Sequence, residues 1–209
     1  MARATTPFSG ITVLDFSRYL PGGYATQVLA DLGATVIKCE DTGAGDFMRH
    51  DYPTMGNGIS YYITALGRNK KSVSLNLKDQ EVVDWFLKMA KEADVIVESF
   101  RPGVTKKLGI DYETINKINP RIIYCSISGY GAEDPRSKKA QHDLNMQATS
   151  GYLSVNHGGT SPLHLCDLSS GMVAGQALLA ALYAREQTGK GTYIDTSMFD
   201  CFVWWNSVL

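Results

Sequence analysis

The stretch GITVLDFSRYLPGGYATQVLADLGATVIKCE, residues 10–40, decides the fold. It begins with the apolar run ITVLDF (11–16) and ends with a second apolar run, ATVIKCE (34–40), and each run is typical of a buried strand. Between them, YATQVLADLG has the apolar spacing of a helix, with Pro21 shortly before it and Gly33 at its end. This strand–helix–strand order predicts a parallel βαβ unit.

The same alternation continues to the end of the chain. Further strands are predicted at KSVSLNL (71–77), ADVIVESF (93–100), RIIYCSIS (121–128) and TYIDTSM (192–198). Further helices are predicted from the cap Asp79 to Ala93, after Pro102 and Gly103, over 111–119, from a capping Asp143 to Ser150, and from Ser169 to Gln187. Long loops are expected at 41–67 and 129–141. The fold class is therefore α/β, a doubly wound, mostly parallel, Rossmann-like sheet that binds its ligand beyond the carboxyl ends of the strands.

Composition excludes several classes of protein. The 209 residues carry a formal charge of −1, which argues against a general nucleic-acid binder. No apolar run approaches the ~20 residues of a membrane span, and the start MARATTPFSG lacks the apolar core of a secretory signal. Four scattered cysteines without CxxC spacing favour reduced thiols in the cytoplasm over a disulfide framework or a zinc site.

The middle of the chain is locally basic. Residues 68–139 hold 14 of the 20 Lys and Arg but only 10 of the 21 Asp and Glu. Such a region suits a small polyanionic ligand, although solvated helix faces produce the same count.

Common catalytic and nucleotide-binding motifs are missing from the sequence. SRYLPGGYATQ follows the first strand without G-x-G-x-x-G, and no P-loop, HExxH or GxSxG occurs. His50, His157 and His164 show no ligand spacing, so structural or surface roles are expected for all three and no metal site is expected.

Five ordered blocks resemble the family III CoA-transferases (CaiB/BaiF-like), which also include formyl-CoA transferase and the α-methylacyl-CoA racemases. The blocks are residues 10–40, NKKSVSLNLK (69–78), residues 93–131, HDLNMQATSGYLSVNHG (142–158) and LCDLSSGMVAGQALLAALYAREQTGKGTYIDTSMFD (165–200). The resemblance implies that residues 1–209 are the N-terminal part of the large CoA-binding domain, without the small second domain of the family. It also implies an interlocked homodimer, or a partner chain that completes the site.

The resemblance singles out Asp167 as a nucleophile that attacks an acyl-CoA thioester and forms an aspartyl mixed anhydride. Its place before a long helix predicts an N-cap, where the helix dipole favours an ionised carboxylate. From the residues alone, a mere capping role stays open. Transfer of CoA between carboxylic acids is the function expected first.

His142 gives the second reading of the site. PRSKKAQHDLN (135–145) resembles the racemase segment in which a histidine moves the α-proton. His142 and Asp167 as two bases would make a 2-methylacyl-CoA racemase. A third reading, from another class, is a non-catalytic CoA-binding or assembly subunit that needs a partner chain.

Binding of CoA gives the basic region a purpose, because Arg and Lys suit its phosphates. The resemblance implies contacts from Leu75, Asn76, Leu77, Lys78, Ser99, Phe100, Arg101, Lys107, Gln141 and Asp143, with Lys70 and Lys71 as additions. Two positions depart from the family. Asp41 and Thr42 follow Glu40 where an arginine often lies near the adenine, which leaves the adenine contact unassigned, and Leu20–Pro21 argues against an oxalate-type substrate.

The end of the chain is strongly apolar. Phe202, Val203, Trp204 and Trp205 form a cluster that is expected to pack against the rest of a longer chain or against a second subunit.

Overall fold

A computed structural model of the chain describes residues 6–207, so the first five residues of the start and the last two of the apolar end lie outside the described residues. It contains one sheet of six parallel strands in the order β3-β2-β1-β4-β5-β6. The strands are β1 (Thr12–Phe16), β2 (Thr35–Glu40), β3 (Lys70–Ser74), β4 (Val95–Glu98), β5 (Ile123–Ser128) and β6 (Thr192–Ser197). The predicted α/β class is confirmed, and this sheet is parallel throughout.

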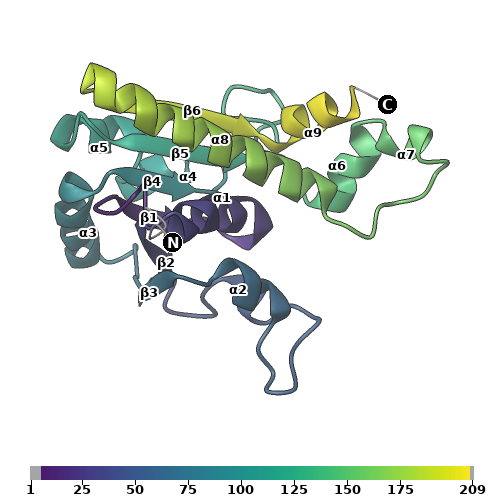
Figure 1. Ribbon diagram of the computed structural model, residues 1–209, viewed down its shortest axis with the longest axis horizontal. Coiled ribbons are helices and arrows are strands. Elements are labelled where there is room, and N and C mark those ends of the chain that lie inside the picture. Colours follow the sequence, from purple (N-terminus) through teal and green to yellow (C-terminus); the bar gives the residue numbers. More distant parts are fainter. Residues whose placement is uncertain (1–5, 208–209) are drawn as a thin grey trace, which may run out of the picture.

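Helices cover both faces of the sheet (Figure 1). On one face, α1 (Tyr19–Asp31) and α8 (Leu165–Thr188) bury their apolar side chains against β1, β4 and β5. On the other face, α3 (Gln80–Glu92) and α5 (Tyr112–Ile118) pack against the same strands. The remaining helices are η1 (Phe47–Arg49), α2 (Tyr61–Leu66), α4 (Val104–Leu108), α6 (Asp143–Thr149), α7 (Tyr152–Val155) and α9 (Met198–Asn206).

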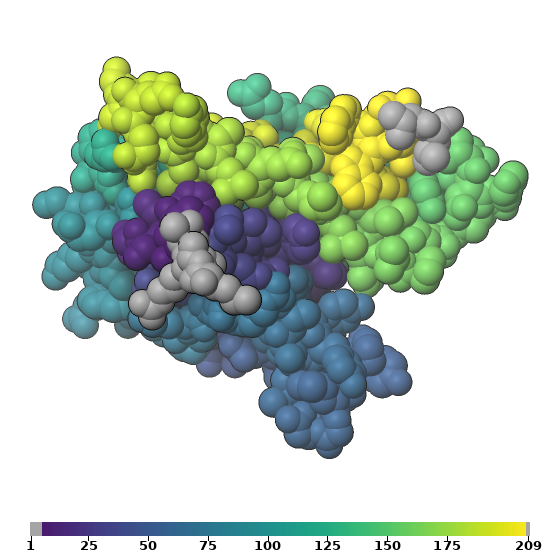
Figure 2. All heavy atoms as spheres, viewed as in Figure 1, coloured from purple at the N-terminus to yellow at the C-terminus, as the bar shows by residue number. Residues whose placement is uncertain are grey.

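Local sequence explains most of these boundaries. Asp79 accepts a hydrogen bond from the Glu81 N–H and begins α3, and Asp111 does the same for Thr114 at α5. The predicted loop 41–67 contains two short helices, η1 and α2, and its segment beside α2 projects from the body of the molecule (Figure 2). Six residues are too few for helical periodicity to stand out in a sequence, which is why α2 was not predicted.

The last apolar cluster of the sequence folds as α9, and the helix divides its residues. Phe202 is 1% exposed and contacts Tyr152, whereas Trp204 is 64% exposed. Trp205 packs partly against the small cluster around Phe202. Phe202 is therefore buried and Trp205 partly buried within the chain itself, whereas Val203 and Trp204 stay exposed.

Helix α8 is long and apolar enough to cross a membrane by length and composition. Its packing accounts for that composition, because Ala174, Leu178 and Leu182 lie in the core between the sheet and α1. Gly171 lets the two helices meet, since a Cβ there would lie 2.7 Å from the Pro21 carbonyl oxygen. We therefore interpret α8 as the central helix of the fold.

A buried network of charges joins β1, β2 and β3. The Lys70 Nζ lies 3.1 Å from the Asp15 carboxylate, and both side chains are at most 2% exposed. Beside it, Lys38 pairs with Asp46 at 2.8 Å. The Thr26 hydroxyl donates to Asp15 at 2.6 Å and accepts from Lys70 at 2.7 Å. Burial alone would raise the pKa of Asp15, but the charges of Lys38 and Lys70 and two hydroxyl donors outweigh it and lower the pKa to about 2.

Candidate active site

Two cavities lie beyond the carboxyl ends of the strands, where a doubly wound sheet binds its ligands. The first, which we call the β3 cavity, has a volume of about 360 Å³ and is lined by Leu75–Lys78 and by residues that follow β1 and β2. The second, which we call the α8 cavity, has a volume of about 690 Å³ and is lined by Asp167 and by the loop before α6. Arg18 and Phe100 line both cavities, so the two cavities adjoin each other at these residues.

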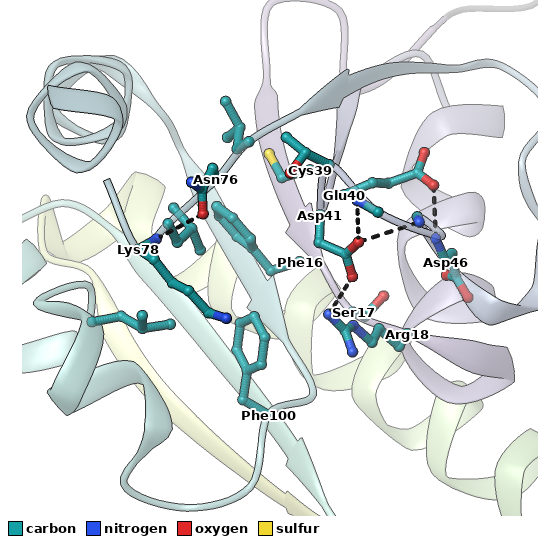
Figure 3. Close-up of a pocket in the computed structure, with 16 residues that line it drawn as sticks. Phe16, Ser17, Arg18, Cys39, Glu40, Asp41, Asp46, Asn76, Lys78 and Phe100 are labelled. Carbon is teal, nitrogen blue, oxygen red and sulfur yellow. Dashed lines mark hydrogen bonds and ion pairs between the residues drawn. The ribbon is translucent and has the colours of Figure 1, made fainter. Parts of the chain in front are cut away.

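The structure divides the residues with an expected role between these cavities. Leu75, Asn76, Leu77 and Lys78 line the β3 cavity, and Figure 3 shows Lys78 and Phe100 facing Arg18 and Asp41 across it. The α8 cavity is lined by Ser99, Phe100, Arg101, Gln141, His142, Asp143 and Asp167. The sequence blocks that carry these residues are distant along the chain but meet at one edge of the sheet.

Two of the expected lysines lie elsewhere. Lys107 is exposed on α4 and lines neither cavity, although its neighbour Leu108 lines the β3 cavity. Lys70 points into the core, where its ammonium group pairs with Asp15 and donates a hydrogen bond to Thr26. Lys70 is therefore a structural residue, and its expected contact with CoA was wrong.

The sequence predicted Asp167 as the N-cap of the long helix. In the structure, Asp167 is instead the third residue of α8. The helix begins four residues earlier than expected, at Leu165, and its N-cap is His164. The Asp167 side chain lines the α8 cavity while the residue as a whole is 9% exposed. Within the described part of the chain, its carboxylate accepts no hydrogen bond, so it faces the cavity without a partner.

Asp143 provides the cap that Asp167 does not. It is the first residue of α6, whose N-cap is His142, and so it does not cap its own helix as expected. Its Oδ1 instead accepts hydrogen bonds from the Cys166 and Asp167 N–H groups at 2.7 and 3.1 Å. Its Oδ2 accepts from the Gln147 side chain at 2.5 Å. Asp143 therefore fixes the first turn of α8 and lies beside Asp167 at the same time.

The expectation that the helix N-terminus keeps Asp167 ionised was also wrong. Burial, followed by the negative charge of Asp143, raises the pKa of Asp167 to about 7. A helix dipole is worth only about 0.3–1 kcal/mol, and one pKa unit corresponds to about 1.4 kcal/mol, so the dipole cannot offset a change of this size. A carboxyl group in a cavity with its pKa near neutrality is typical of functional sites.

This ionisation is open to direct measurement. We expect the Asp167 carboxyl carbon, followed by NMR in selectively labelled protein, to titrate near pH 7. Asp143→Asn should move that titration to lower pH, because it removes a neighbouring negative charge but keeps a carbonyl oxygen for the α8 N–H groups. A wild-type titration near the ordinary value of 3.8 would contradict this account of the site.

His142 lies at the mouth of the α8 cavity. It is exposed, and its ring meets that of Tyr19 edge-on at 6.0 Å. Tyr19 stacks in turn on Phe47 at 5.6 Å and has a φ of 61°, a left-handed conformation that is uncommon for a side chain of its size. The aromatic pair thus forms one wall of the cavity beside His142.

His164 is a site residue that sequence reasoning missed. It lines the α8 cavity, and its Nε2 lies 3.1 Å from the Tyr62 hydroxyl. Asp143, His164 and Asp167 offer one ligand atom each within 4.8 Å of one another, a spacing that a metal ion can bridge. The three hydrogen bonds that Asp143 already accepts account for its carboxylate without a metal. The only feature of the sequence that could have indicated a role for His164 in the site is its position directly before an apolar helix.

The chain is similar in sequence to known CoA-transferases. The model of CoA-transferase family III matches residues 8–208. Acetyl-CoA:oxalate CoA-transferase from Acetobacter aceti is 43% identical over 95% of this chain, and the match covers 52% of that relative. Succinyl-CoA:glutarate CoA-transferase from Mus musculus is 41% identical over 92% of this chain and is covered to 45%. The chain thus spans about half the length of the curated relatives it matches.

A solved structure shares the fold. The crystal structure of a CAIB/BAIF family protein from Brucella suis superposes with a TM-score of 0.90 at 33% sequence identity. The superposition covers 98% of this chain and 56% of that one.

Proposed function

The chain belongs to CoA-transferase family III, and from this membership we propose that it transfers CoA between carboxylic acids, with Asp167 as the nucleophile. The observation that carries the proposal is the Asp167 carboxylate, which faces the α8 cavity without a hydrogen-bond partner among the described residues, while the β3 cavity adjoins the α8 cavity. The activities for which the two relatives are named support a CoA thioester as donor and a carboxylic acid as acceptor. One relative is named for transfer to oxalate, so oxalate belongs in the panel of acids even though Leu20–Pro21 predicts that an oxalate-type acid is a poor substrate.

The proposed reaction begins at the thioester. An Asp167 oxygen attacks the thioester carbonyl and the C–S bond breaks. CoA departs as a thiolate, and the acyl group remains bound to Asp167 as a mixed anhydride. The thiolate then attacks the Asp167 carbonyl, the anhydride C–O bond breaks, and the first acid leaves while CoA is held as a thioester of Asp167. The carboxylate of the second acid attacks this thioester, which releases the CoA thiolate and forms a second mixed anhydride. The thiolate finally attacks the acyl carbonyl of that anhydride, so that the new acyl-CoA leaves and the Asp167 carboxylate is restored.

The electrostatics of Asp167 suit its proposed role as a nucleophile. Only the ionised form is a nucleophile, and a pKa of about 7 keeps a large fraction of it ionised near neutrality. The same raised pKa means that the ion is poorly solvated and therefore reactive. We expect the rate of CoA transfer to increase as pH rises through 7, because the ionised fraction of Asp167 increases over that range.

The long site suits the shape of the proposed substrate. We propose that the nucleotide end of CoA occupies the β3 cavity, where Lys78 lies, and that the thioester reaches Asp167 in the α8 cavity. Phe100 follows β4 and lines both cavities, while its neighbours Ser99 and Arg101 line the α8 cavity. Lys107, exposed beside the β3 cavity, remains a candidate for the 3′-phosphate.

We also propose that a further segment completes the site. It corresponds either to the half of the relatives that this chain does not match or to a second copy of the chain. The exposed Trp204 on α9 and the open α8 cavity support this proposal. Four buried, unpaired cysteines support a reducing, cytoplasmic location.

A panel of acyl-CoA donors and carboxylic acids, followed by mass spectrometry in deuterated water, tests the function. We expect CoA to pass to added acids without deuterium at the α-carbon. The racemase hypothesis predicts the opposite: deuterium enters a 2-methylacyl-CoA without any acceptor, and His142→Ala slows that exchange. Binding of CoA without either reaction would favour the non-catalytic subunit.

A further inference from the structure

Arg18 occupies the junction of the two cavities. It directly follows the β1 strand and the buried Ser17, and its side chain is 37% exposed. Among the Lys and Arg residues in the described part of the chain, Arg18 alone lines both cavities. Lys78 lines only the β3 cavity, and Arg101 and Lys139 line only the α8 cavity.

The guanidinium of Arg18 is held in place from three sides. Its Nη2 donates to Asp41 at 2.9 Å, and its charge lies 5.3 Å from the ring centre of Phe47 and 6.0 Å from that of Phe100. Its backbone N–H donates to the Ser99 hydroxyl at 2.8 Å. The next residue, Tyr19, has the left-handed φ of 61°, which directs the chain away from β1 and leaves Arg18 at the junction. The side chain is therefore positioned before any ligand arrives.

Most of the donor capacity of Arg18 is unused. A guanidinium carries five N–H groups, and among residues 6–207 only the bond to Asp41 takes one of them. Asp41 is 41% exposed and lines the β3 cavity only, and Figure 3 shows its carboxylate paired with Arg18. The remaining N–H groups form a planar fork, which is the geometry that binds phosphate oxygens in pairs.

We propose that Arg18 binds the pyrophosphate of CoA where the ligand passes from the β3 cavity to the α8 cavity. This inference rests on the proposed function. In CoA, the pyrophosphate lies between the nucleotide and the thiol-bearing arm, so a ligand with its ends in the two cavities brings the pyrophosphate to their junction. Asp41 and the two aromatic rings act as positioning groups that orient the guanidinium.

Calorimetric titration of Arg18→Gln with CoA, dephospho-CoA and pantetheine tests the assignment. Charge-assisted hydrogen bonds are worth about 1.5–3 kcal/mol, so the variant should bind CoA about 10- to 150-fold more weakly. The same loss is expected for dephospho-CoA, which keeps the pyrophosphate, and little loss for pantetheine, which lacks it. Arg18→Lys, which keeps the charge but not the fork, should fall between the two and serves as the test if Arg18→Gln fails to fold.

Arg68→Gln is the matched control, because Arg68 pairs with Asp31 through Nη2 on the surface and lines neither cavity. It should bind all three ligands like the wild type. Equal binding of CoA by wild type and Arg18→Gln overturns the assignment alone. A loss seen with CoA but not with dephospho-CoA also overturns it, because the contact would then be to the 3′-phosphate. A wild-type protein that binds no CoA overturns the proposed function together with this inference.

Discussion

Asp167→Asn is expected to lower the rate of CoA transfer by about 10⁴-fold or more, the scale seen when a covalent nucleophile is removed. The amide has nearly the shape of the carboxyl but no anionic oxygen to attack the thioester. Binding of CoA should change little, because the contacts proposed for the nucleotide lie at the other end of the site. Steady-state transfer assays, together with trapping of the acylated wild-type enzyme by hydroxylamine and peptide mass spectrometry, provide the measurements.

The chain offers a close control for this substitution. Asp200 is also the third residue of a helix, α9, but it is exposed and lines neither cavity. Asp200→Asn should transfer CoA at the wild-type rate. Transfer by Asp167→Asn at a rate close to that of the control would remove Asp167 from the mechanism.

Asp15→Ala is expected to lower the free energy of unfolding by about 3–5 kcal/mol, because it leaves the buried Lys70 ammonium without its counter-charge. Asp31→Ala, which removes the partner of Arg68 at the surface, should cost less than about 1 kcal/mol. Urea denaturation of the two variants gives the comparison.

The pH dependence of unfolding adds a second measurement. The pKa of Asp15 is about 2 in the folded chain against 3.8 as the ordinary value, so its stabilising effect is complete above pH 4 and is lost as pH falls toward 2. This acid-sensitive part of the stability should be absent from Asp15→Ala. Similar losses for Asp15→Ala and Asp31→Ala would show that the buried pair contributes no more than a surface pair.

The sequence was sufficient to predict which segments surround the site. Leu75–Lys78 and Ser99–Arg101 follow strands, and parallel strands bring their carboxyl ends to one edge of a sheet. The family resemblance named these two segments and also Asp167, His142 and Asp143, and the structure places all of them along the two cavities. Both kinds of inference use the order of elements along the chain, which a sequence contains.

Properties that depend on tertiary packing could not be predicted. Asp143 caps α8, a helix that begins more than 20 residues later, and no local pattern connects the two. The raised pKa of Asp167 follows from burial and from this same neighbour, so it was out of reach for the same reason. His164 and Arg18 become site residues only through the packing of α2 and β4 against them.

The central position of β1 has a consequence for how the protein is made. β1 lies between β2 and β4, and the Thr12 N–H pairs with the Asp94 carboxylate 82 residues further along the chain. Ribosomes add about 5–20 residues each second. The partner strand β4 is therefore synthesised roughly 4–16 s after β1. During that interval the edge of β1 that β4 covers in the folded chain has no partner, and an unpaired apolar strand edge can pair with another chain.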